Sequence, residues 1–103
     1  MHRMEIWHNP RCSKSRAAKQ RLDDDNIAYT ERRYLDDVPS AEELDHVLEL
    51  LGKQPWEIAR TKEAAYPATL EHDRAKWIEH MVANPSLIER PIVIDGGKAH
   101  LER

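Results

Sequence analysis

The strongest constraint on the fold is a change of pattern within the first two dozen residues. Met4-Glu5-Ile6-Trp7 alternates apolar and polar side chains, which predicts a short β-strand. His8-Asn9-Pro10 ends this strand, because proline cannot donate a hydrogen bond to a β-ladder. Ser13 then fits the N-cap of a helix that runs to about Asp24. The chain therefore begins with a strand, a loop and a helix.

The next two elements can also be recognised from local patterns. Ile27 to Tyr34 contains β-formers but carries charge on both faces, which predicts a strand at the edge of a sheet. Ser40 and Glu43 match a capping box, and apolar residues follow at helical spacing as far as Leu51. Gly52 is suited to ending this helix in a left-handed conformation.

The second half of the chain predicts helical segments followed by a hairpin. Pro55 to Leu70 is typical of short helical turns joined by loops, and Arg74 to Ala83 has the apolar spacing of a helix. Pro91-Ile92-Val93-Ile94 and Lys98 to Leu101 flank Asp95-Gly96-Gly97. A glycine-containing turn between two short predicted strands indicates a β-hairpin.

This order of elements favours one fold class. A cysteine at the start of the first helix, together with a late hairpin led by proline, suggests a thioredoxin-like α/β fold with a mixed sheet. The helices between the second strand and the hairpin would form a lobe inserted at about residues 38–88. Because no repeat, low-complexity tract or linker divides the chain, we expect residues 1–103 to form a single domain.

Composition excludes several classes of function. Sixteen basic residues against 19 acidic ones give a net charge of −3, which argues against a general nucleic-acid binder. No apolar run approaches the roughly 20 residues of a membrane span, and MHRMEIWHNP lacks the apolar stretch of a secretory signal. The single cysteine cannot form an internal disulfide. We therefore expect a protein of the reducing cytoplasm.

The surroundings of Cys12 predict a reactive thiolate. A free cysteine has a pKa of about 8.5, and the thiolate is the nucleophile. Unpaired N–H groups at a helix start favour negative charge there. Arg11, Lys14, Arg16 and His8 would add positive charge nearby. The same groups would bind a phosphate-like oxyanion.

Cys12 and His8 also have purely structural interpretations. A lone cysteine is often a small buried residue without chemistry, and a histidine that ends a strand is often structural. Ser15 occupies the place of the second cysteine of a C-x-x-C motif, so any redox cycle needs an outside thiol. The remaining histidines show no spacing typical of a metal site, and we expect neither a metal nor a bound cofactor.

Three segments together resemble the glutaredoxin-coupled arsenate reductases. They are HNPRCSKSR at residues 8–16, RTKE at residues 60–63 and ERPIV at residues 89–93. The similarity covers essentially the whole chain in order and spacing. It is strongest to the arsenate-reductase-like branch, which carries C-S-K-S-R where the plasmid-type enzymes carry C-G-T-S-R.

The resemblance implies a thioredoxin-like fold with a helical insertion and a set of site residues. Cys12 matches the catalytic cysteine, and His8 matches a histidine that helps to lower its pKa. Arg60, Arg90 and, by its position in the pattern, Arg103 match three arginines that hold the oxyanion, a task suited to the guanidinium fork. The resemblance also implies a cis bond between Arg90 and Pro91. Side chains and backbone N–H groups of three further residues would help to hold the anion: Ser13, Ser15 and Arg16.

The implied function is an oxidoreductase that reduces arsenate to arsenite through an adduct of Cys12 with arsenic. Glutathione would be the co-substrate and glutaredoxin the partner, with no nucleic acid or membrane involved. Two alternatives of the same fold remain open. One is a thiol-disulfide oxidoreductase without arsenate activity, and the other is a redox-sensing regulator that binds RNA polymerase.

Overall fold

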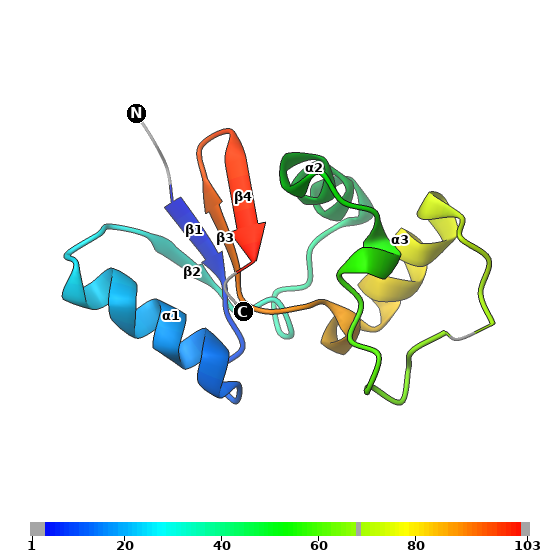
Figure 1. Ribbon diagram of the computed structural model, residues 1–103, viewed down its shortest axis with the longest axis horizontal. Coiled ribbons are helices and arrows are strands. Elements are labelled where there is room, and N and C mark those ends of the chain that lie inside the picture. The colour runs from blue at the N-terminus through cyan, green and yellow to red at the C-terminus, as the bar shows by residue number, and fades with distance from the viewer. Residues whose placement is uncertain (1–3, 68, 102–103) are drawn as a thin grey trace.

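Within the residues that the computed structural model describes, 4–67 and 69–101, four strands form one mixed sheet (Figure 1). The strands are β1 (Met4–Trp7), β2 (Thr30–Arg32), β3 (Ile92–Asp95) and β4 (Lys98–Leu101), in the order β2-β1-β3-β4. β1 runs parallel to β2 and antiparallel to β3, and β3 and β4 form an antiparallel hairpin. The predicted edge position of the second strand is therefore confirmed.

Helices lie on both sides of this sheet. Helix α1 (Ser13–Asp24) covers one face, and α2 (Ala41–Leu51) and α3 (Arg74–Ala83) lie on the other side (Figure 1). The short 3₁₀ turns η1 (Pro55–Glu57) and η2 (Pro85–Leu87) flank α3 in sequence, so α2, η1, α3 and η2 all lie between β2 and β3. The arrangement is the predicted thioredoxin-like α/β fold. None of the helices in the described ranges is long and apolar enough to cross a membrane.

Alternation along β1 divides the apolar core between the two faces of the sheet. Ile6 packs with Val93 and with Ala18 of α1. Trp7, the next residue, points to the opposite face, as neighbouring strand residues must, and joins the larger cluster of buried side chains contributed by α2, α3 and the turns. The loop after Trp7 thus begins at the buried end of β1.

Most predicted elements are confirmed, and two details are wrong. The capping box of Ser40 and Glu43 forms, Gly52 ends α2 with φ of 68°, and the hairpin turns at Gly96 with φ of 61°. The N-cap of α1 is Cys12 and not Ser13. β2 is also shorter than Ile27 to Tyr34, because its ladder with the short β1 ends at Arg32.

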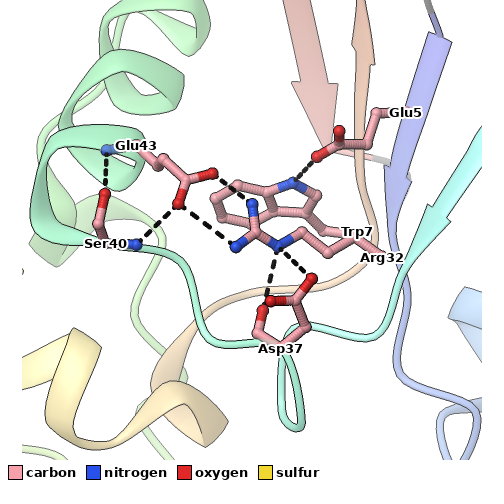
Figure 2. A network of polar contacts seen from close by, with 6 residues as sticks. All are labelled: Glu5, Trp7, Arg32, Asp37, Ser40 and Glu43. Carbon is pink, nitrogen blue, oxygen red and sulfur yellow. Dashed lines mark hydrogen bonds and ion pairs between the residues drawn. The ribbon is translucent and has the colours of Figure 1, made fainter.

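A polar network fixes the start of α2 against the sheet (Figure 2). The Arg32 guanidinium lies 5.6 Å from the centre of the Trp7 ring and donates to the carboxylate of Glu43. Its Nε donates to the carbonyl of Asp37 at 3.0 Å. The Glu43 carboxylate also accepts the backbone N–H of Ser40 at 3.0 Å. One carboxylate therefore caps α2 and also holds the edge strand.

This network predicts a loss of stability in acid. The Arg32 guanidinium, with the N–H of Ser40, lowers the pKa of Glu43 from 4.5 to about 2. Between those values the unfolded chain binds a proton that the native chain does not, so stability falls as the pH drops through that window. We expect Glu43→Gln to reduce the difference in unfolding free energy between pH 6 and pH 3, measured by urea titration.

The control is Glu42→Gln, one residue earlier in the same helical turn. We expect this variant to keep the acid sensitivity of the wild type. If Glu43→Gln and the wild type lose the same stability between the two pH values, the Glu43 carboxylate does not carry the effect.

Candidate active site

Cys12 occupies the N-cap of α1 and is partly exposed. Its backbone is extended, with φ of −96° and ψ of 124°. Its carbonyl accepts the first helical hydrogen bond from Arg16 at 3.0 Å, and its own N–H donates to the carbonyl of Asn9 at 3.0 Å. A side chain at the N-cap lies opposite the N–H groups of the first helical turn, so the cysteine stands where α1 presents its unpaired donors.

These donors lower the pKa of the Cys12 thiol. Burial raises that pKa, but the backbone N–H groups of Ser15 and Lys14 lower it, and the Arg90 guanidinium lowers it further through a hydrogen bond and its charge. The net shift is downward. A nucleophilic thiolate is therefore favoured by the local structure, and its stabilising groups come from two segments far apart in the sequence.

His8, Asn9 and Ser15 hold the loop that carries the cysteine. All three residues are buried. The Oγ of Ser15 lies 2.7 Å from Nδ1 of His8 and accepts the N–H of Asn9 at 3.0 Å. The side-chain oxygen of Asn9 accepts the N–H of Arg11 at 3.0 Å. The strand end and the first turn of α1 are thus joined through one hydroxyl group.

Burial disfavours the positive charge that the sequence-based prediction assigned to His8. Burial lowers the pKa of the His8 imidazole, assisted by Lys19, Arg33 and Arg16, and outweighs the opposite effect of Glu31. Burial therefore favours the neutral form of the ring, whose contact is with Ser15. The hydroxyl of Ser15 is occupied by this contact and by Asn9, so its backbone N–H is the group directed to the thiolate.

Removing the Ser15 hydroxyl should destabilise the loop. Ser15→Ala leaves the N–H of Asn9 buried without its acceptor, and we expect the free energy of unfolding to fall by about 1–3 kcal/mol. Ser13→Ala is the matched control, because Ser13 is exposed on the same turn, and its effect should stay within about 0.5 kcal/mol. Urea unfolding measures both. Equal stabilities of the two variants would contradict the role given to the hydroxyl.

A short antiparallel contact brings the segments of Arg60 and Arg90 together. Ala59 pairs with Ile88 in an isolated bridge. The N–H of Arg60 donates to the carbonyl of Leu87 at 2.8 Å. The N–H of Glu89 donates to the carbonyl of Ile58 at 2.9 Å. Two arginines that are thirty positions apart in the sequence are thereby carried on adjoining pieces of backbone.

The two guanidinium groups differ in their surroundings. Arg60 forms an ion pair with Glu63 at 2.6 Å and donates to the carbonyl of Ser86 at 3.3 Å. Arg90 approaches Glu89 only to 3.9 Å and stabilises the Cys12 thiolate. Among the described residues, its Nε–H is a buried side-chain donor without a hydrogen-bond partner. The bond between Arg90 and Pro91 is cis, as the family resemblance implied.

Tyr34 is a site residue that the sequence did not reveal. Its side chain is fully buried, stacks on Trp7 with 6.5 Å between ring centres, and lies 3.4 Å from the carbonyl of Ile88 through its hydroxyl. Burial raises the pKa of Tyr34 to about 12, opposed by the charges of Arg90 and Arg60, and the Cys12 thiolate adds to the rise. The pKa of the Tyr34 phenol therefore depends on the charges of Arg60, Arg90 and Cys12. Because Tyr34 follows a charged strand, the sequence pattern did not indicate that it belongs to the site.

The other predicted site residues are not all brought to the thiol. Ser13 and Arg16 are exposed on α1. Arg16 acts on the imidazole of His8. Arg103 lies outside the residues that the structure describes. Within residues 4–67 and 69–101, no three histidine, cysteine, aspartate or glutamate side chains gather as metal ligands would.

Known proteins share both the sequence pattern and the fold. The model of the ArsC family matches residues 7–102. An arsenate reductase of Neisseria meningitidis is 37% identical, with 100% of this chain and 92% of the relative covered. A protein from the glnII region of Streptomyces viridochromogenes is 46% identical, with coverages of 97% and 91%. The structure of an arsenate reductase from Vibrio cholerae superposes with a TM-score of 0.86 at 36% identity, with coverages of 95% and 87%.

A regulator is also among the relatives. Global transcriptional regulator Spx 1 of Bacillus cereus is 29% identical, with 87% of this chain and 72% of the regulator covered. The sequence pattern is thus shared by proteins named as enzymes and by a protein named as a regulator.

Proposed function

Because this chain belongs to the ArsC family, we propose that it reduces arsenate to arsenite through a bond between the Cys12 sulfur and arsenic. Relatives named as arsenate reductases, at 35% and 37% identity, support this substrate. The observation that carries the chemistry is the lowered pKa of a partly exposed thiol at a helix start.

The reaction can be written with balanced atoms and electrons. The Cys12 thiol condenses with arsenate, which forms the S–As bond and releases water. The thiol of glutathione then attacks the Cys12 sulfur, the S–As bond breaks, and its electron pair leaves with arsenic, which departs as arsenite. Arsenic gains two electrons, and the two sulfurs lose them by forming a disulfide. A thiol of glutaredoxin takes over the glutathione and returns Cys12 to its starting state.

The site suits the first of these steps. The N–H groups of Lys14 and Ser15 and the Arg90 guanidinium stabilise the attacking thiolate. The buried Nε–H of Arg90 offers a donor to an oxyanion bound to the sulfur. Arg60 would have to exchange its ion pair with Glu63 for the anion, because the two groups are now 2.6 Å apart.

The need for outside thiols follows from the sequence. Cys12 is the sole cysteine of the chain, so the mixed disulfide has no internal thiol to resolve it. We therefore assign glutathione as co-substrate and glutaredoxin as partner. Both act in the reducing cytoplasm, where we place the protein.

The test is arsenite production with glutathione and glutaredoxin present and with each omitted in turn. We expect turnover to require both thiol components. No arsenite above the background without the protein would reject arsenate as substrate, and turnover without glutaredoxin would reject that partner alone.

The second candidate is a thiol-exchange or regulatory protein of the same fold, favoured by the regulator among the relatives. Protection of Cys12 from alkylation separates the two candidates. An oxyanion site predicts that millimolar arsenate, sulfate or phosphate slows alkylation. If no tetrahedral anion protects the thiol, the exchange function is favoured, and a pull-down with RNA polymerase tests the regulatory form of it.

A further inference from the structure

A groove of about 300 Å³ opens beside the loop that leads to Cys12. Because β1 and β2 are parallel, the chain leaves both strands at the same end of the sheet (Figure 1). Residues of the two segments that follow these strands line the groove. Its volume is at the lower end of the range for small-molecule sites, about 300–1,000 Å³. The lining residues are Asn9, Pro10, Arg11, Arg33, Leu35 and Asp36.

The groove adjoins the reactive residue directly. The N–H of Cys12 donates to the carbonyl of Asn9 at 3.0 Å, and the side chain of Asn9 accepts the N–H of Arg11. The wall of the groove is therefore the same turn that presents the thiol.

Both basic and acidic side chains line the groove. Arg11 and Arg33 contribute two exposed guanidinium groups, and Asp36 contributes one exposed carboxylate. The Nε–H of Arg33 donates to the carboxylate of Glu31 at 2.8 Å, so Arg33 would have to exchange this ion pair for a ligand carboxylate. The N–H of Asp36 donates to the carbonyl of Arg33 at 3.0 Å, so the backbones of these two residues form one turn. Pro10 and Leu35 supply apolar surface between them.

We propose that this groove binds a peptide thiol with two carboxylates and one ammonium group, the chemistry of glutathione, while its sulfur reacts at Cys12. Guanidinium groups pair well with carboxylates, and the Asp36 carboxylate pairs with the ammonium group. The inference rests on the proposed function, which requires a thiol co-substrate at this sulfur. It adds the surface that selects that thiol.

The test measures disulfide exchange at Cys12 and needs no arsenate. The thiolate attacks one sulfur of oxidised glutathione, a new S–S bond forms, the old one breaks, and one glutathione thiolate leaves. The rate is compared with that of 2-hydroxyethyl disulfide, which carries no charge. Mass spectrometry follows the mixed disulfide in the wild type, Arg11→Ala, Arg33→Ala and the control Lys98→Ala, which lies on the exposed edge strand β4.

We expect Arg11→Ala and Arg33→Ala to slow exchange with oxidised glutathione about tenfold each and to leave exchange with 2-hydroxyethyl disulfide within about twofold. Lys98→Ala should change neither rate. An equal fall with both disulfides would show a general change in thiol reactivity, and unchanged rates would show that the groove binds nothing. Either result overturns the inference.

Asp36→Asn distinguishes a site for a peptide thiol from simple attraction of anions. If Asp36 pairs with the ammonium group, its loss slows exchange with oxidised glutathione. If the groove only attracts carboxylates, removing a negative charge accelerates that exchange, and the inference fails.

The outcome is independent of the substrate assignment. Should the protein produce no arsenite while exchange keeps its dependence on Arg11 and Arg33, the assignment of arsenate falls and the groove stands. Should arsenite form with the same Michaelis constant for glutathione in Arg11→Ala, Arg33→Ala and the wild type, the groove falls and the assignment of arsenate stands.

Discussion

Replacing Cys12 by serine is expected to abolish arsenate reduction, with kcat/KM at least about 10³-fold below that of the wild type. The helix start and the Arg90 guanidinium lower the pKa of the thiol, but a serine hydroxyl stays protonated in the same place and is a weak nucleophile. Sulfur is also required for the second step, in which a disulfide forms as arsenic takes two electrons. The measurement is arsenite production with glutathione and glutaredoxin in excess.

The control moves the thiol by one position. Cys12→Ser combined with Ser13→Cys keeps one cysteine in the chain but places it inside the first turn of α1. We expect this double variant to be as inactive as Cys12→Ser, since a thiol there no longer lies at the N-cap. Activity of Cys12→Ser within tenfold of the wild type would exclude a covalent intermediate at this sulfur.

Arg90 is expected to give the second largest effect. Arg90→Met removes the guanidinium that stabilises the thiolate, including its buried Nε–H, which has no hydrogen-bond partner among the described residues. We expect the pKa of Cys12 to rise and kcat/KM for arsenate to fall by about 10²–10³-fold, as when one donor to a developing charge is lost. Ultraviolet thiolate absorbance across pH measures the pKa, and arsenite production measures the rate.

Two variants sharpen this result. Arg90→Lys keeps the positive charge but not the fork of parallel donors. We expect this variant to keep a thiol pKa near that of the wild type while its kcat/KM for arsenate still falls. Lys98→Met removes one positive charge at the opposite end of β3, across from Asp95, and should change neither quantity. If Arg90→Met leaves the thiol pKa unchanged, the contact between Arg90 and the sulfur is not formed in solution.

Local patterns were sufficient for the elements whose determinants are close in sequence. Ser40 and Glu43 cap α2 from positions three apart, and Gly52 ends the same helix through its own backbone freedom. The hairpin at Gly96 is similarly decided by its turn and the short strands beside it. Such features need no knowledge of the rest of the molecule.

The errors lie where the outcome depends on distant partners. His8 was assigned positive charge because a histidine near a cysteine suggests it, but burial within the folded loop lowers its pKa and directs the ring to Ser15. Tyr34 follows a charged strand and has no sequence signal of its own, although its ring stacks on Trp7 and its hydroxyl lies 3.4 Å from the carbonyl of Ile88 once the chain is folded. No local sequence pattern around His8 or Tyr34 predicts these contacts.

The sequence alone determined that a cysteine would stand between a strand and a helix, because proline, polar caps and alternation act over a few residues. It also identified Arg60 and Arg90, through the family resemblance. Only the tertiary structure decided how these groups meet: the bridge from Ala59 to Ile88 brings the arginines onto adjoining backbone, and Arg90 then reaches the sulfur. Burial and long-range charge are properties of the assembled chain, and they set which groups are ionised.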